Sequence, residues 1–134
     1  GQGIFQARQQ LYASYDLALH GPVPQDPLAL WAQMEGATPM GHVAGTMFPA
    51  GFAHIAGSYS AGYYGYLWAK VMALDMASVF KSAPGGFLDE KVGRRLRDEV
   101  YGVGNTRDVA ESVEKFLGRK RSQEPFLEYV GIKK

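Results

Sequence analysis

A group of hydroxyl and imidazole side chains near the middle of the chain could carry chemistry. Tyr59, Tyr63 and Tyr66 are spaced so that, on a continuous helix, they would project from one face. His54 precedes them in a glycine-rich segment that includes Gly57. A neutral phenol can donate a hydrogen bond to a carbonyl oxygen, or to the oxyanion that forms when the carbonyl is attacked. A glycine admits a ligand backbone at short range. The pattern therefore indicates a possible binding site for a peptide backbone.

The same spacing has a second interpretation. Aromatic residues at helical period more often pack into a core, each hydroxyl reaching a partner at the core's edge. A loop histidine is likewise more often a solvated side chain than a hydrogen-bond donor to a substrate. Spacing alone leaves both interpretations open.

Metal and nucleophile motifs are absent from the sequence. His20, His42 and His54 are separated by 22 and 12 residues, and none is followed by the glutamate of a His-Glu-x-x-His helix. No serine lies in a Gly-x-Ser-x-Gly turn. We therefore expect this chain to hold no metal by itself.

Composition excludes several classes of protein. With 134 residues, 46% of them hydrophobic, the chain is long enough for one domain with a core. A net charge of +1 gives no basis for nucleic-acid binding, and the basic run at 119–121 is expected to be a solvated turn. No cysteine is present, which fits a cytoplasmic protein. Lys70 and Asp75 interrupt the longest apolar stretch, so no membrane span is expected.

The elements that must position the tyrosines are helices. Apolar residues recur at helical spacing over 3–19, 27–35, 60–81, 88–100, 106–117 and 123–130. Asp26 is the expected N-cap of the second helix, and Asn105 or Thr106 that of the fifth. Residues 36–57 are expected to form a long loop with, at most, a short strand around 43–48. The prediction is an all-α fold of about six helices.

The segment from His54 to Trp68 reads His-Ile-Ala-Gly-Ser-Tyr-Ser-Ala-Gly-Tyr-Tyr-Gly-Tyr-Leu-Trp. It closely resembles a segment of the thimet oligopeptidase family of zinc metallopeptidases, which includes oligopeptidase A and the bacterial dipeptidyl carboxypeptidases. The similarity continues through 73–80, 93–100, 116–119 and 125–127 and includes 26–31 upstream. The resemblance thus covers nearly the whole chain and implies the C-terminal part of a larger helical peptidase domain.

The resemblance also implies roles for individual residues. His54 and Gly57 match a flexible substrate-contacting loop, Tyr59 and Tyr63 match substrate-binding tyrosines, and Tyr66 matches a tyrosine that stabilises the oxyanion. Where the family has a glycine pair before the first tyrosine, this chain has Gly57 followed by Ser58. Zinc would belong to the complete enzyme, because its ligands would lie before Gly1.

These implications define the expected function. Residues 1–134 are expected to be a fragment of a peptidase that cuts short peptides, inactive alone and partnered by the remaining N-terminal part. The helical pattern reaches the start of the chain, since residues 1–19 are all compatible with helix, and this fits that expectation. The alternative is a standalone, non-catalytic helical module that binds peptides or pairs with itself as a homodimer.

Overall fold

The computed structural model of the protein describes residues 1–132, and it confirms the all-α class. Seven α-helices and three short 3-10 or π-helical segments occur in that part of the chain, with no strand. The chain divides into two compact units, Gly1–Leu67 (unit 1) and Trp68–Lys134 (unit 2). Within residues 1–132, no helix is both long enough and apolar enough to cross a bilayer.

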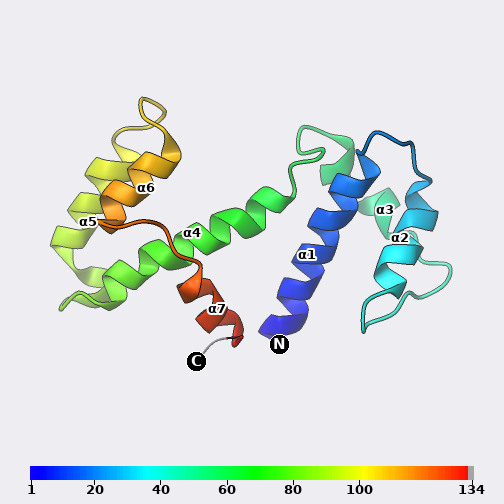
Figure 1. Ribbon diagram of the computed structural model, residues 1–134, viewed down its shortest axis with the longest axis horizontal. Coiled ribbons are helices and arrows are strands. Elements are labelled where there is room, and N and C mark those ends of the chain that lie inside the picture. Colours follow the sequence, from blue (N-terminus) through cyan, green and yellow to red (C-terminus); the bar gives the residue numbers. More distant parts are fainter. Residues whose placement is uncertain (133–134) are drawn as a thin grey trace. The chain divides into compact units, whose positions relative to one another are not determined.

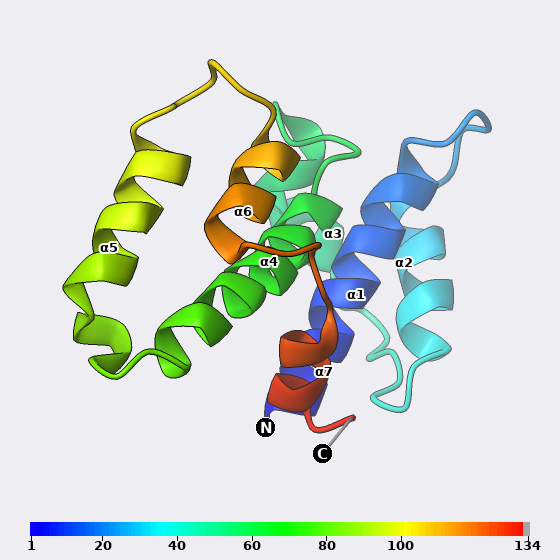
Figure 2. The ribbon, with the colours of Figure 1, turned by 60° about the vertical axis from the view of Figure 1, so that its left-hand side comes forward.

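Unit 1 is built around a helical pair. Helix α1 (Gln2–Leu19) runs alongside α2 (Pro27–Gly36), as Figures 1 and 2 show. The Asp26 side chain caps α2 as expected, accepting a hydrogen bond from the Ala29 amide at 2.7 Å. A proline follows at the first helical position, where its missing N–H and fixed φ cost nothing. Both helices therefore confirm the sequence prediction.

The core of unit 1 is aromatic. Trp31 and Tyr15 are almost completely buried, and their rings meet edge to face at 5.2 Å. Burying side chains of this size stabilises a fold by roughly 1.5–3 kcal/mol each. Leu11, Phe52 and Ile55 complete the buried set, and the Tyr63 ring packs against it. The core thus joins α1 and α2 to the segment that leads into the tyrosines.

Residues 36–57 are not an unbroken loop, and the short strand considered at 43–48 does not form. The four-residue α3 (Phe48–Gly51) and a 3-10 turn (Ala53–Ala56) follow one another there. The physical reason is burial, because Phe48 stacks on Trp31 with ring centroids 4.4 Å apart. This tertiary contact folds the segment inward where local propensity is weak.

Unit 2 holds most of α4 (Tyr64–Lys81), together with α5 (Glu90–Leu96), α6 (Val109–Leu117) and α7 (Glu124–Val130). A π-helical segment, Arg97–Tyr101, extends α5 and packs against α6. The expected caps of α6 were wrong. Asp108, not Asn105 or Thr106, accepts from the Ala110 amide at 2.8 Å.

The core of unit 2 is centred on α6. Val113, Phe116 and Leu117 are buried, and partly buried side chains from α4, α5 and the π-helical segment pack around them. Gly118 ends α6 at φ +71°, a left-handed conformation that glycine adopts without steric cost.

A buried ion pair supports this unit. Asp75 is only 1% exposed, and its two carboxylate oxygens lie 2.5 and 3.2 Å from the Arg119 guanidinium nitrogens. The Ser122 amide donates to the same carboxylate at 2.7 Å. The sequence analysis predicted a solvated turn at 119–121. For Arg119 this prediction was wrong, because its guanidinium pairs with a buried carboxylate. Its charge offsets a carboxylate that burial would otherwise make costly.

Candidate functional site

The five predicted site residues all lie in unit 1, within one short stretch. His54 is on the 3-10 turn, Gly57 follows that turn, and Tyr59 lies in the loop. Tyr63 immediately precedes α4, and Tyr66 is in its first turn. Helix α4 begins at Tyr64, four residues later than predicted, so the three tyrosines do not share one continuous helix.

The fold brings the side chains together despite this. The rings of Tyr59 and Tyr66 stack with centroids 5.7 Å apart, and those of Tyr63 and Tyr66 are 5.1 Å apart. His54 Nε2 lies 3.0 Å from the Tyr66 hydroxyl oxygen, within hydrogen-bonding distance. Tyr59 and Tyr66 are about half exposed, at 51% and 44%. We call His54, Tyr59, Tyr63 and Tyr66 the tyrosine cluster.

The Tyr66 hydroxyl stays protonated at neutral pH. Desolvation, and then the neighbouring phenol of Tyr59, hold the pKa of Tyr66 above its ordinary value. If His54 donates from Nε2 to the Tyr66 oxygen, the Tyr66 proton points away from the histidine. The group can then donate one hydrogen bond to an oxygen of an added ligand.

Tyr63 has a different environment. Its hydroxyl donates to Gln9 Oε1 on α1 at 3.2 Å, and its ring packs against the core of unit 1. Burial is the main reason that the pKa of Tyr63 is raised. The Tyr63 hydroxyl is thus engaged within the fold, and only the partly exposed ring is available to a ligand, while Tyr59 and Tyr66 are more exposed.

Gly57 does not adopt the left-handed backbone conformation, and no atom crowds the position that a β-carbon would occupy. Its φ is −137°, and a β-carbon built there would meet only the Ala53 carbonyl oxygen, at 3.6 Å. The protein itself therefore has room for a side chain at this position. A requirement for glycine here would have to come from a bound ligand.

The sequence analysis missed one residue that shapes this site. Asp16 on α1 is completely buried, and its carboxylate accepts hydrogen bonds from the amides of Ala61 (3.0 Å) and Tyr63 (2.9 Å). The sequence did contain a signal for this residue. Asp16 is next to Tyr15 and one turn after Tyr12, so its carboxylate lies within the apolar face of the predicted helix 3–19. A charge in that position must find partners on burial.

No histidine is available to form a metal site with the others. His20 Nδ1 lies 3.0 Å from the Asp16 carboxylate, His42 Nδ1 lies 2.7 Å from Glu35, and His54 pairs with Tyr66. Among residues 1–132, no three metal-ligating side chains come together. The residues present do not fit a zinc site, so no step of a reaction is assigned to a metal held by this chain.

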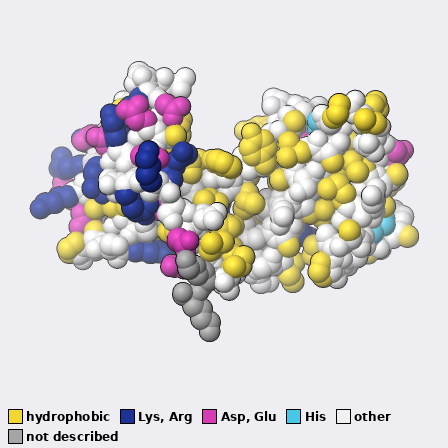
Figure 3. Space-filling model, viewed as in Figure 1, with side chains coloured by type: hydrophobic (Ala, Val, Ile, Leu, Met, Phe, Trp, Pro, Cys, Tyr) yellow, Lys and Arg dark blue, Asp and Glu magenta, His cyan; other side chains and the backbone are white. Residues whose placement is uncertain are grey.

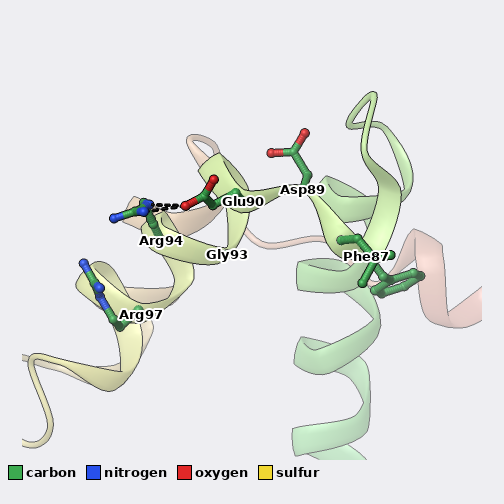
Figure 4. Close-up of a pocket in the computed structure, with 7 residues that line it drawn as sticks. Phe87, Asp89, Glu90, Gly93, Arg94 and Arg97 are labelled. Carbon is green, nitrogen blue, oxygen red and sulfur yellow. Dashed lines mark hydrogen bonds and ion pairs between the residues drawn. The ribbon is translucent and has the colours of Figure 1, made fainter.

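Two hollows are lined by described residues of unit 2, and neither includes a residue of the tyrosine cluster. The more open one, about 490 Å³, is lined by charged residues that already have partners. Glu90 pairs with Arg94, as Figure 4 shows, Asp89 caps α5 through the Val92 amide, and Arg97 pairs with Asp98. Each of these charged side chains therefore has a partner within its own helix or at a helix terminus.

The second hollow is an apolar groove of about 440 Å³. Side chains of α4, the π-helical segment and α6 line it, including Met72, Met76, Val100, Tyr101 and Val109. Tyr101 and Val109 remain 72% and 56% exposed. We call this surface the apolar groove.

Charge is distributed unevenly between the units. Of the 14 Lys and Arg and 13 Asp and Glu residues, unit 1 holds only Arg8, Asp16, Asp26 and Glu35. Its three carboxylates are all engaged, in the Asp16 contacts, the α2 cap and the His42 pair. On the face in Figure 3, dark blue Lys and Arg side chains gather over unit 2. The tyrosine cluster thus belongs to a nearly uncharged unit.

Many all-α proteins could carry an exposed histidine–tyrosine pair such as His54 and Tyr66, so the fold and the site alone do not define a family. Sequence comparison does. Residues 1–132 match the profile of Peptidase family M3. Saccharolysin of Saccharomyces cerevisiae is 35% identical over 136 residues, a region that covers 96% of this chain and 19% of that protein. Organellar oligopeptidase A of Arabidopsis thaliana is 34% identical, over 97% of this chain and 17% of the relative. Oligopeptidase A of Escherichia coli is 38% identical over 87 residues, 64% of this chain and 12% of the relative.

The chain therefore belongs to Peptidase family M3, a family of zinc metallopeptidases. This confirms the resemblance drawn from the His54–Trp68 segment. The chain spans only about a fifth of the length of saccharolysin and of organellar oligopeptidase A.

Proposed function

We propose that this chain forms part of a longer zinc oligopeptidase and supplies side chains that bind a short peptide and stabilise its transition state. Tyr66 is the catalytic residue in this proposal, as donor to the oxyanion. His54, Gly57, Tyr59 and Tyr63 bind substrate. The zinc ligands and the group that activates water come from the remaining, N-terminal part of the peptidase.

The observation that carries the proposal is the His54–Tyr66 pair, 3.0 Å apart on the surface of a chain of this family. The Tyr66 hydroxyl is a neutral donor, which suits an oxygen that gains negative charge during the reaction. The nearly uncharged unit around it suits a ligand recognised by its amide backbone rather than by charge. Zinc, when bound in the complete enzyme, would supply Lewis-acid activation of the attacking water.

The substitution Tyr66→Phe in the complete peptidase tests this role. Removing one oxyanion donor typically lowers turnover by about 10²–10³-fold. We expect kcat to fall by that amount with KM little changed, because the bond strengthens only in the transition state. Steady-state kinetics on a short peptide measure both constants.

Tyr64→Phe is the matched control, since it removes the hydroxyl of a 49% exposed tyrosine outside the cluster. Tyr64→Phe should leave kcat within about twofold, because the Tyr64 hydroxyl makes no contact with the transition state in this proposal. An unchanged kcat in Tyr66→Phe would rule out the oxyanion role.

A second candidate function rests on the apolar groove of unit 2. A standalone, non-catalytic module could use such a surface to bind peptides or a second copy of the chain. In the peptidase, by contrast, the groove would be covered by the rest of the protein.

A cytoplasmic location is part of the first proposal, in line with the absence of cysteine. Among the relatives, one is named as a probable cytosolic protein and another as chloroplastic or mitochondrial. Subcellular fractionation of the source cells would decide between these compartments.

A further inference from the structure

The segment from Gly57 to Tyr66, which carries the three tyrosines, is a run of tight turns that leads into α4. The Ser60 amide bonds to the Gly57 carbonyl, and the Gly62 amide bonds to the Tyr59 carbonyl at 2.8 Å. The Tyr66 amide then bonds to the Tyr63 carbonyl at 3.1 Å. Each turn fixes the next, so the position of one peptide group determines where the neighbouring tyrosines stand.

This run of turns is tied to α1 at one buried carboxylate. Asp16 Oδ1 accepts from the Ala61 amide and Oδ2 from the Tyr63 amide, across 45 and 47 residues of sequence. Both amides precede α4, which begins at Tyr64. The Tyr63 amide is at the helix boundary, where N–H groups have no intrahelical partner. The carboxylate also complements the partial positive charge of that helix end. Asp16 therefore acts as a cap supplied by another helix.

One of the two anchored residues has an unusual backbone. Ala61 has φ +57° and is the only non-glycine residue among 1–132 with a positive φ. That conformation costs an L-residue roughly 1–2 kcal/mol and persists where surrounding contacts impose it. The Asp16 hydrogen bond to the Ala61 amide is such a contact.

We infer that Asp16 is a positioning residue of the proposed active site: its carboxylate holds the turns at 61–63 and thereby sets the positions of Tyr59 and Tyr66. The inference rests on the proposed function, because it concerns the hydroxyl to which that function assigns the catalytic role. A misplacement of about 1 Å in a reacting group can cost about 10²-fold in rate. Asp16 touches no substrate and acts only through the loop backbone.

His20 shares the same carboxylate. Its Nδ1 lies 3.0 Å from Asp16 Oδ1 and 2.8 Å from the Asp16 carbonyl oxygen. Both neighbours are acceptors, so the proton is on Nδ1. Three donors thus converge on Asp16, and together they satisfy a carboxylate that is completely buried.

The test is Asp16→Asn in the complete peptidase. The amide nitrogen that replaces one oxygen is a donor and cannot accept from the Ala61 or Tyr63 amide. We expect kcat to fall by about tenfold or more, because the oxyanion donor Tyr66 moves. KM should rise as well, because the proposed substrate-binding residue Tyr59 moves with the same turns. In the 134-residue chain, nuclear Overhauser contacts between the His54 and Tyr66 rings should weaken or disappear.

Asp75→Asn is the matched control. It changes the other buried carboxylate, which also accepts from a distant backbone amide but lies in unit 2. It should lower thermal stability, yet leave kcat per folded molecule and the His54–Tyr66 contact unchanged. If Asp16→Asn behaved in the same way as this control, the carboxylate would be merely structural and the inference would be wrong.

Ala61→Val decides the matter should Asp16→Asn fail to fold. Ala61 is exposed, so this change removes no core packing, while a β-branched side chain strongly opposes a positive φ. Loss of kcat with loss of the His54–Tyr66 contact supports the inference, and an unchanged kcat overturns it. If Tyr66→Phe left kcat intact while Asp16→Asn still broke the ring contact, the proposed function would fail and the positioning would stand.

Discussion

The hydroxyl groups of Tyr63 and Tyr66 have different partners, although their ring centroids are only 5.1 Å apart. Tyr66 meets His54 at the surface, whereas Tyr63 donates inward to Gln9 on α1. A hydroxyl already engaged with a partly buried acceptor contributes to stability. An exposed hydroxyl is available to a ligand. The same residue type thus serves two purposes within one turn of chain.

Tyr63→Phe measures the structural part of this division. We expect the free energy of unfolding to fall by about 1 kcal/mol, because Gln9 Oε1 loses its donor. The kcat of the complete peptidase should fall much less than in Tyr66→Phe. Denaturant unfolding and steady-state kinetics give the two quantities.

Tyr12→Phe provides the comparison for stability. Its ring contacts Tyr63 in the same aromatic cluster, and no hydrogen bond of its hydroxyl is seen among residues 1–132. A loss under about 0.5 kcal/mol is expected there, as for other changes that break no hydrogen bond. Equal losses in the two variants would show that the Gln9 contact contributes nothing measurable.

At the scale of elements, α1 and α4 each bury one aspartate that fastens a distant segment. Asp16 holds the turns before α4, and Asp75 holds the segment after α6 through Arg119 and the Ser122 amide. Because hydrogen bonds to a buried carboxylate are strong and directional, each fixes a loop that apolar packing alone would leave loose. Apolar contacts supply the cores, and these two carboxylates set where the connecting segments lie.

Arg119→Ala tests the second fastening. It leaves the Asp75 carboxylate buried without its counter-charge, a change that costs about 3–5 kcal/mol in fully buried pairs. Since the Arg119 side chain is 43% exposed, we expect a smaller loss, about 2–3 kcal/mol after allowance for solvent screening. Thermal or denaturant unfolding of the chain would measure it.

Arg121→Ala is the control from the same basic run. Its guanidinium is 3.4 Å from Glu114 on the surface, and such pairs contribute about 0–1 kcal/mol. If Arg119→Ala were no more destabilising than Arg121→Ala, the Asp75 pair would not be a significant support of unit 2.

At the scale of the whole molecule, the two units differ in charge and in exposed surface. Unit 1 carries the tyrosine cluster with very few charges, and unit 2 carries most of the charges and the apolar groove. Residues 1–132 bring no metal-ligating group together, while the family hydrolyses peptides with zinc. Under the proposed function, the zinc ligands come from another part of the peptidase and this chain supplies the tyrosine cluster.

The 134-residue chain alone should therefore not hydrolyse short peptides, with or without added zinc. With the apolar groove uncovered, it should also self-associate, because exposed apolar patches drive association. A fluorogenic peptide assay and light scattering test the two expectations. Hydrolysis by the purified chain would contradict the proposed division, and a monomeric mass at high concentration would count against self-association.

Tyr101→Glu locates the surface responsible for association. It places a charge on a 72% exposed residue of the groove, and we expect it to shift the chain toward the monomer. Leu88→Glu changes a residue that is 94% exposed outside the groove and should have no such effect. The same response in both variants would mean that association does not use the groove.

The sequence by itself determined the helices and their boundaries wherever the signal was local. The period of Leu11, Tyr15 and Leu19 and the Asp26-Pro27 cap are readable within one or two turns, and α1 and α2 formed as predicted. The residues around Tyr66 were also sufficient by themselves to indicate the family. These features depend on neighbours in sequence, which is why periodicity and motif reveal them.

Only the tertiary structure decided where α4 begins and which tyrosine faces outward. Helical period continues upstream of Tyr64, but Asp16, 45 residues from Ala61, takes up the amides of the preceding turns and fixes a left-handed residue there. The Arg119–Asp75 pair spans 44 residues in the same way. Such contacts form because burial removes water from a carboxylate and leaves distant donors as its partners, and no local pattern specifies which donors those are.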